Sequence, residues 1–330
     1  MSRSWMKAMN LPNEATAWQA PAFPAVMRHR AVRSFLDKWQ VGRRPLLITG
    51  HGRSGTTWVG NVFATSKRAL YCFEPGNPAV AERGERDVWF RYLQPGERDA
   101  LFEQLFDTAF RGLPYNRRWR RAAWHRLVPG YRMVVKEVAA FMCLEWLAAR
   151  YDPAVLVVIR HPCPTILSEL AQGTDPQQSR QALLRQPGLW EGEAAPYRTV
   201  LEAAESAAEI LAVIWTVRLY VLAGALTRHP EWQVVQYEAL CADPVAEFRE
   251  LFEALGLAWT AAVEQFVIQS STGYKPGHYS GVRLSAQQPD KWLQEMEPEA
   301  IEAVRHQVEL FDLPFYRSAA DWGASSRLPE

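Results

Sequence analysis

The sequence predicts an α/β fold of three layers, in which a central parallel sheet lies between two layers of helices. Short apolar segments recur along the chain, and helical patterns lie between or after most of them. Strands that alternate with helices favour a parallel sheet that is covered on both faces. A chain of 330 residues, of which 48% are hydrophobic, can bury a large core without a metal ion or disulfides.

Five segments have the pattern of buried strands, because each is a short and mostly apolar run. The first, Leu46 to Thr49, ends at Gly50, and the strongest pattern is Val155 to Ile159. The other three predicted strands are Leu70 to Phe73, Met133 to Lys136 and Gln233 to Gln236.

Helices are predicted between these strands and on either side of them. The helix that starts at Val245 has the clearest end signals, with Asp243 as N-cap, Pro244 as the first helical residue and Gly256 after the last turn. The predicted helices are Val26 to Trp39, Thr57 to Ser66, Cys143 to Arg150, Thr165 to Leu170, Thr199 to Thr227 and Val245 to Leu255.

The chain is predicted to consist of an N-terminal extension, residues 1–43, and one domain, residues 44–330. Insertions near 82–130 and 172–197 break the alternation of strands and helices. The second is rich in Gln, Pro and Gly and is predicted to be a long loop, a kind of segment that often binds ligands. The first contains the basic aromatic stretch Arg117 to Arg126, which we interpret as a solvated helix face; contact with an acceptor molecule or a membrane surface is the alternative.

Composition narrows the class of protein. The formal net charge of +1 argues against nucleic acid as a partner. The four cysteines are far apart, which fits free thiols in a reducing cytosol better than disulfides or a zinc site. The N-terminus lacks the apolar core of a signal peptide, and the apolar segment Ile210 to Leu226 carries Arg218 and is shorter than a typical span. We therefore expect a cytoplasmic protein without a transmembrane segment, while peripheral membrane contact stays open.

The segment after the first strand has the features of an anion-binding loop. Its glycines let successive backbone N–H groups point at one anion, and the following helix N-terminus adds partial positive charge. The spacing Gly50-x4-Gly55 matches a nucleotide-binding P-loop, but Thr56 stands where that motif requires lysine, which argues against a kinase. The cation here is Arg53, which can contact phosphate or sulfate through two nitrogens. The predicted anion contacts are Gly52, Arg53, Ser54, Gly55, Thr56 and Thr57.

A second anion site is predicted at the end of the fourth strand. Arg160 follows Ile159 directly, and Ser168 lies eight residues further on, inside a predicted helix. Ligands of open α/β sheets bind outside the carboxyl ends of the strands. An arginine at a strand end is by itself more often part of a structural ion pair, but together with the loop it indicates a ligand with two anionic groups.

These motifs resemble those of sulfotransferases that use 3′-phosphoadenylyl sulfate (PAPS) and release 3′-phosphoadenosine 5′-phosphate (PAP). The run from Gly52 to Trp58 is similar to the family's 5′-phosphosulfate loop, and Arg160-x-Pro162-x5-Ser168 is similar to its 3′-phosphate motif. Tyr237-Glu238-Ala239-Leu240 resembles the family's Tyr-Glu-Asp-Leu segment, with Ala239 in place of Asp. Arg283, followed by Lys291-Trp292, resembles a late motif more loosely.

The resemblance implies a P-loop-like fold and PAPS as the sulfuryl donor. Arg53, Thr56 and Thr57 would hold the 5′-phosphate and the sulfate, and Arg160 and Ser168, helped by Arg283, would hold the 3′-phosphate. Trp58 and Tyr237 would lie against adenine, although plain core packing is an equal alternative for Trp58. No metal ion is implied, since sulfate carries less charge than a terminal phosphate and fixed Arg and Lys groups can suffice.

A carboxylate base is implied by the same resemblance. Members that act on phenols and steroids carry a His after a Lys-Thr pair, and the matching segment here, 134–138, has none. Glu74 follows the second strand, where carbohydrate-modifying members place a Glu, so the implied acceptor is a carbohydrate or glycoconjugate. Glu74 is the first candidate base and Glu137 the second, while Lys136 can stabilise the bridging oxygen. His51, inside the loop, is expected to be a solvated turn residue.

Other functions stay open at this point. The acceptor hydroxyl could belong to a natural product, a peptide or a lipid. Two alternatives belong to other functional classes: a kinase-like nucleotide-binding protein, and a non-catalytic protein that binds the nucleotide or acts as a scaffold. The sequence carries no signal of the oligomeric state.

Overall fold

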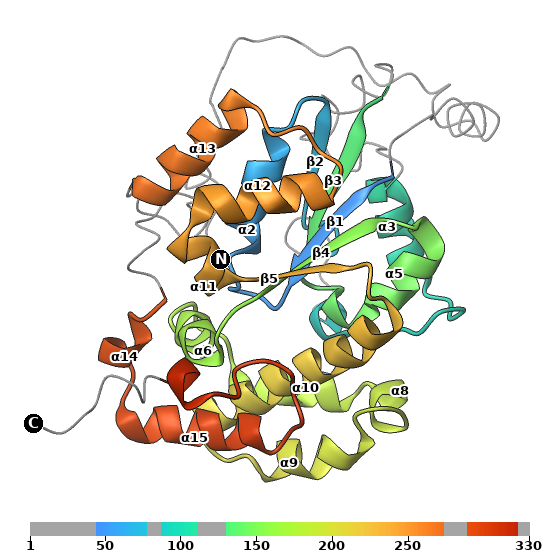
Figure 1. Ribbon diagram of the computed structural model, residues 1–330. Coiled ribbons are helices and arrows are strands. Elements are labelled where there is room, and N and C mark those ends of the chain that lie inside the picture. Colours follow the sequence, from blue (N-terminus) through green and yellow to red (C-terminus); the bar gives the residue numbers. More distant parts are fainter. Residues whose placement is uncertain (1–43, 78–86, 111–129, 274–288, 323–330) are drawn as a thin grey trace, which may run out of the picture.

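The computed structural model describes residues 44–77, 87–110, 130–273 and 289–322 (Figure 1). The N-terminal extension, the predicted helix within it, the basic aromatic stretch and Arg283 lie outside the described residues. The predictions for those segments therefore stay predictions.

The five predicted strands form one sheet, and all of its neighbouring strands are parallel. The order across the sheet is β2-β3-β1-β4-β5, so β1 lies in the middle. Each observed strand agrees with its prediction to within one residue at either end. The strands are β1 (Leu46–Gly50), β2 (Ala69–Phe73), β3 (Arg132–Glu137), β4 (Ala154–Ile159) and β5 (Gln233–Gln236).

Helices cover both faces of the sheet, which confirms the three-layer α/β fold (Figure 1). Side chains alternate along β1, so Leu47 packs with α3, α5 and α10, whereas Leu46 and Ile48 pack with α2, α12 and α13. Burial on both faces is the reason why the central strands β1 and β4 are almost entirely apolar. These helices are α2 (Thr56–Ala64), α3 (Ala100–Phe110), α5 (Leu144–Tyr151), α10 (Ala207–Arg228), α12 (Pro244–Ala254) and α13 (Ala261–Thr272).

The prediction of a long loop for residues 172–197 is wrong, because this segment is largely helical. It contains α7 (Pro176–Leu184), α8 (Pro187–Trp190) and the 3-10 helix η5 (Ala195–Tyr197). The Asp175 side chain caps α7 by accepting from the N–H groups of Gln177 and Gln178. Asp175 followed by Pro176 is the same start signal that correctly placed α12, so the sequence did contain the evidence.

The single helix predicted from Thr199 to Thr227 is two helices, α9 (Arg198–Ala203) and α10. The break is set by Ser206, which forms a capping box with Glu209 at the start of α10. Among the described residues, α10 is the one helix with the length and composition of a membrane span. Of its most apolar 18-residue stretch, 72% is buried inside the protein. It contacts α7 and α15 (Pro298–Glu309), which agrees with the prediction of a core helix.

Three short helices and three 3-10 helices make up the rest of the described structure. They are α6 (Pro162–Leu170), α11 (Tyr237–Ala242), α14 (Trp292–Glu295) and the 3-10 helices η3 (Asp87–Phe90), η4 (Phe141–Cys143) and η7 (Ala319–Trp322).

Candidate active site

The carboxyl ends of the five parallel strands lie along one edge of the sheet, and a predicted site residue stands at or directly after each of them. Because ligands of such sheets bind at this edge, the strand order also sets the order of the site residues. From β2 through β3, β1 and β4 to β5, these residues are Glu74, Lys136 with Glu137, the loop that contains Arg53, Arg160 and Tyr237.

The loop between β1 and α2 is shaped by two residues with positive φ. Gly55 is the N-cap of α2 with φ 86°, and Arg53 has φ 71°. A Cβ on Gly55 would lie 2.4 Å from the Tyr237 ring, so only glycine fits between that ring and the helix start. Thr56 and Thr57 begin α2, where the first backbone N–H groups of a helix have no partner within the helix. The loop is therefore built to present N–H groups to an anion.

The structure brings the two predicted anion motifs together. Arg53 Nε donates a hydrogen bond of 2.9 Å to Ser168 Oγ on α6, and Arg160 Nη1 donates one of 3.0 Å to the Arg53 carbonyl oxygen. The Arg160 guanidinium carbon lies 4.5 Å from the centre of the Tyr237 ring. Within the described residues, the buried atoms Arg160 Nε and Ser54 Oγ have no hydrogen-bond partner. Such donors are suited to an anionic ligand held by both motifs.

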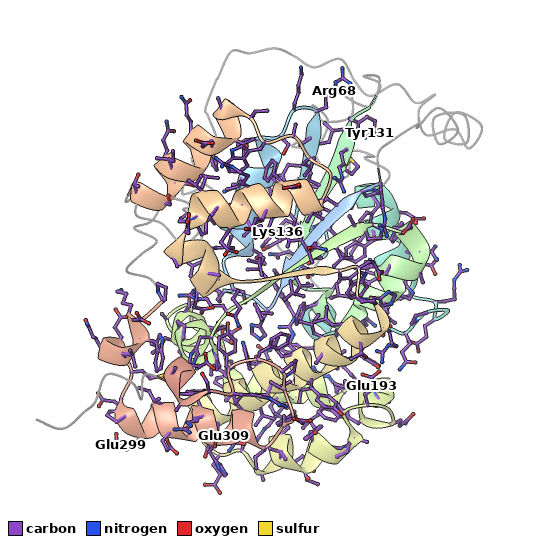
Figure 2. All side chains as sticks on the ribbon, in the orientation of Figure 1. Arg68, Tyr131, Lys136, Glu193, Glu299 and Glu309 are labelled. Atoms are coloured by element: carbon purple, nitrogen blue, oxygen red, sulfur yellow. The ribbon has the colours of Figure 1, made fainter. Side chains whose placement is uncertain are left out.

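A buried ion pair lies at the ends of β2 and β3. The side chains of Glu74 and Lys136 are 5% and 2% exposed, and Lys136 Nζ pairs with Glu74 Oε1. The other oxygen, Oε2, accepts a hydrogen bond of 2.6 Å from Asn77 Nδ2. Lys136 also lies over the ring of Phe73, 4.9 Å from its centre, in the interior of the molecule (Figure 2). The carboxylate of Glu74 is thus held in place by one cation and one amide.

Glu137 has no exposed surface, and backbone N–H groups surround its carboxylate. Oε2 accepts from Gly76 N at 2.6 Å, and Oε1 accepts from Val138 N at 2.8 Å and from Ala139 N at 2.6 Å. Burial raises the pKa of Glu137 to about 7, with a further contribution from the charge of Glu74, and the N–H groups oppose this shift. The contacts of Glu137 fix the backbone after β2 and β3.

Comparison with known families decides what kind of protein this is. The model of the sulfotransferase family matches residues 45–261. The chain belongs to the sulfotransferase family. This confirms the family that the loop and the Arg160 motif predicted, and with it the expectation of a sulfotransferase enzyme.

Several solved sulfotransferase structures are similar to this chain at low identity. The sulfotransferase domain from the curacin biosynthetic pathway is 15% identical, with a TM-score of 0.44, and the match covers 82% of this chain and 100% of that chain. Mouse sulfotransferase SULT7A1 complexed with PAP is 12% identical, with a TM-score of 0.46 and coverage of 91% and 95%. STF9 from Mycobacterium avium is 13% identical, with a TM-score of 0.45 and coverage of 88% and 81%. A comparison with curated proteins finds no match.

Trp58 of this sulfotransferase packs in the core beside α12 and α13. Its side chain meets Tyr237 and Phe248 edge-on, with ring centres 6.2 Å and 5.2 Å away, and its Nε1 donates a hydrogen bond of 2.9 Å to Ser270 Oγ. Trp58 is 7% exposed. The contact of Trp58 with adenine stays a prediction, and Tyr237 is the ring that lies against Arg160.

His51 is buried, so the expectation of a solvated turn histidine is wrong. Its Nδ1 lies 2.9 Å from the Gly52 carbonyl oxygen and 3.6 Å from Glu169 Oε1. Burial, together with the positive charge of Arg218, lowers the pKa of His51 to about 3, so the imidazole is neutral. Arg218 lies within α10 and donates to the carbonyl oxygen of Val138 at 3.2 Å.

Sequence reasoning missed Glu169, which lies beside His51 of the loop, and Arg218, whose charge acts on both residues. Glu169 follows Ser168 and lies against Gly52, where a Cβ would be 3.7 Å from its Oε1. The only sequence signal was a charged residue, Arg218, in an apolar helix, and a charge that is buried in this way needs a partner. Among the described residues, no group of His, Cys, Asp or Glu side chains has the arrangement of a metal site.

Glu137→Gln should change how the stability of the protein depends on pH. The pKa of Glu137 is raised from 4.5 to about 7 on folding, so the folded state binds the proton more tightly than the unfolded state. The contribution of Glu137 to stability is therefore fully present below about pH 4.5 and is lost as the pH rises to about 7. We expect the difference in free energy of unfolding between wild type and variant to fall by about 3 kcal/mol over this range.

Urea unfolding of both proteins at several pH values measures this difference. The titrating groups that do not interact with Glu137 cancel because they are common to the two proteins, and the measured difference includes the coupling of Glu137 to Glu74 and Lys136. A difference that stays constant with pH would show that Glu137 has the same pKa in the folded and unfolded chain.

Proposed function

We propose that this sulfotransferase moves a sulfuryl group from PAPS to a hydroxyl of a carbohydrate or glycoconjugate, with Glu74 as the base. The observation that carries the proposal is the buried Glu74–Lys136 pair, which lies at the same edge of the sheet as the anion-binding loop. A base and a cation beside a donor site are what sulfuryl transfer to a hydroxyl requires.

The donor site fits a nucleotide with anionic groups at both the 5′ and 3′ positions. The contact between Arg53 and Ser168 places the loop next to the Arg160 motif, so one ribose could span them. Arg53 and the N-terminus of α2 would hold the 5′-phosphate and the sulfate, and Arg160 with Ser168 would hold the 3′-phosphate. Bound PAPS would supply a sulfuryl group that is activated by its link to phosphate.

The protein's own part in the reaction is to position the acceptor and take up its proton. Glu74 Oε1 or Oε2 would accept the proton of the hydroxyl, while Asn77 keeps the carboxylate oriented. The ammonium group of Lys136 would stabilise negative charge that develops on the bridging oxygen. Glu137 is the weaker candidate for the base, because both of its oxygens already accept backbone N–H groups.

The carbohydrate acceptor rests on the type of base and its position. Glu74 follows β2 directly, as in the carbohydrate-modifying members that the Phe73-Glu74-Pro75 segment resembles, and no histidine occurs in 134–138. A hydroxyl on a natural product or lipid is the alternative acceptor. The panel of acceptors in the following experiment separates these.

Calorimetry with PAP, followed by transfer assays with PAPS, tests the proposal on the full chain. We expect PAP to bind, magnesium ATP to bind more weakly, and glycans in a mixed panel to gain sulfate by mass spectrometry. Tighter binding of ATP than of PAP would overturn the donor assignment. Sulfation of lipid or natural-product alcohols in preference to glycans would overturn the acceptor assignment, and PAP binding without transfer to any acceptor would indicate a binding protein.

Ser168→Ala should weaken PAP binding about tenfold. The variant loses a hydroxyl that contacts Arg53 and is predicted to contact the 3′-phosphate, and hydrogen bonds to charged groups contribute about 1.5–3 kcal/mol. Ser179→Ala on α7 is the matched control, because the Ser179 hydroxyl donates only to the Asp175 carbonyl oxygen. Calorimetry should give wild-type affinity for the control, and an unchanged affinity in Ser168→Ala would remove Ser168 from the donor site.

A further inference from the structure

His161, the residue after Arg160, is enclosed by aromatic side chains from the C-terminal part of the chain. The Trp292 ring stacks on it with centres 4.6 Å apart and planes 13° apart, and the rings of Tyr316 and Trp322 meet it at 5.1 Å and 4.6 Å. Its Nδ1 lies 3.3 Å from the N–H of Cys163, so His161 is the N-cap of α6. Residues far along the chain therefore pack on the backbone that carries Arg160.

The carboxylate of Glu238 connects three parts of the chain at this point. Its Oε1 accepts a hydrogen bond of 3.0 Å from the His161 backbone N–H, and its Oε2 accepts one of 2.9 Å from the Tyr316 hydroxyl. Glu238 follows Tyr237, the residue whose ring lies against the Arg160 guanidinium. The same carboxylate thus links the segments after β4 and β5 to the C-terminal segment.

Tyr316 is held in a backbone conformation that non-glycine residues rarely adopt. Its φ is 56°, and its carbonyl oxygen accepts a hydrogen bond of 3.0 Å from Trp322 Nε1. The side chain is 7% exposed. Strained residues of this kind persist only where the surroundings fix them, and they are frequent near binding sites. In this conformation the Tyr316 hydroxyl reaches Glu238 Oε2.

We propose that Tyr316 is a positioning residue for donor selectivity, which holds Glu238 and thereby fixes Arg160 for the 3′-phosphate of the nucleotide. The inference rests on the proposed function, since it takes PAPS as the donor. Without the Tyr316 hydroxyl, Glu238 is held at only one oxygen, and the His161 N–H loses a rigid acceptor. A small shift of the backbone there moves the Arg160 guanidinium, whose contacts with a phosphate depend strongly on geometry.

The selectivity for the 3′-phosphate is the quantity that separates this role from general structural support. PAP carries the 3′-phosphate and adenosine 5′-monophosphate (AMP) lacks it, so the ratio of their affinities isolates contacts with that group. Tyr316→Phe keeps the ring against His161 and removes only the hydroxyl. We expect this variant to bind PAP about tenfold more weakly, the loss typical of one charge-assisted contact, while AMP binding stays within about twofold.

Two further variants complete the experiment. Glu238→Ala should lower the ratio of PAP to AMP affinity in the same direction, because it removes both oxygens that accept from the His161 N–H and the Tyr316 hydroxyl. Tyr151→Phe is the matched control: the Tyr151 hydroxyl also donates to a carboxylate, Asp107 Oδ1, at 2.8 Å, but it does so from α5. The control should leave both affinities at their wild-type values.

Calorimetry of the full-length proteins with PAP and with AMP gives the four ratios. An unchanged ratio in Tyr316→Phe, or an equal loss for PAP and AMP, would overturn the inference. If the wild type itself does not prefer PAP to AMP, the proposed donor is wrong, and this result is distinct from a failure of Tyr316. Should Tyr316→Phe not fold, an unchanged ratio in Glu238→Ala overturns the inference on its own.

Discussion

Glu74→Gln lowers the turnover number by about 100- to 10,000-fold and leaves the affinity for PAP within about twofold of the wild type, if Glu74 is the base. The variant keeps the shape of the side chain and one oxygen that can accept from Lys136, whereas its amide nitrogen cannot replace the oxygen that accepts from Asn77. What it loses is the ability to take a proton from the acceptor hydroxyl. Single-turnover assays with bound PAPS measure this loss directly.

Glu137→Gln and Glu309→Gln are the comparisons that give this result its meaning. Glu309 lies at the surface on α15, where it pairs with Arg305, and its replacement should change neither turnover nor binding (Figure 2). Glu137→Gln should retain turnover in the molecules that are folded, because its carboxylate holds backbone N–H groups. If Glu74→Gln keeps full turnover and Glu137→Gln loses it, the base is Glu137.

The central strands could be predicted from the sequence because β1, β3 and β4 are buried on both faces of the sheet. A segment such as Leu46 to Ile48 or Val155 to Ile159 is apolar at every position, and this signal is local. The strand order is not local, since β1 lies between β3 and β4 and pairs with residues more than 80 positions away. The helices in 172–197 were missed for another reason. The high content of Gln, Pro and Gly was read as a loop, although Asp175-Pro176 is a helix start signal.

The candidate site could be predicted to the extent that its residues follow strand ends in short motifs. Arg53, Ser168 and Arg160 were selected in this way, and the structure brings them within hydrogen-bond distance of one another. The contact between Glu238 and Tyr316 joins residues that are 78 positions apart, and no pattern in either segment points to the other. Side-chain partners of this kind depend on tertiary packing, so the supporting contacts of a site are harder to predict than its motif.

The choice between Glu74 and Glu137 shows what the structure adds to such a motif. In the sequence both are glutamates that follow an apolar strand. In the structure, Glu74 contacts a lysine and an amide, whereas Glu137 accepts three backbone N–H groups. A carboxylate that satisfies backbone N–H groups supports the fold, whereas one that is paired with side chains leaves the backbone intact when it exchanges a partner for a substrate.

Gly55→Ala should weaken PAP binding by about 100-fold or more. Gly55 has φ 86°, and its added Cβ would lie 2.4 Å and 2.5 Å from two carbons of the Tyr237 ring. The left-handed conformation costs a non-glycine residue about 1–2 kcal/mol, and an overlap of this kind costs about 1–3 kcal/mol more. Movement of the Tyr237 ring would displace Arg160, which lies over it, so both anion motifs are disturbed. Calorimetry with PAP measures the loss.

Backbone strain and the overlap with Tyr237 can be separated, because Gly256 has a positive φ but no neighbour that a Cβ would overlap. Gly256 follows α12 with φ 65°, and a Cβ there would meet no atom within 4 Å. Gly256→Ala should therefore lower stability by about 1–2 kcal/mol through backbone strain and leave PAP binding unchanged. In a Tyr237→Ala background the overlap is gone, so the added effect of Gly55→Ala on PAP binding should shrink to that of strain. An equal effect of Gly55→Ala in both backgrounds would show that the ring of Tyr237 does not transmit the disturbance to Arg160.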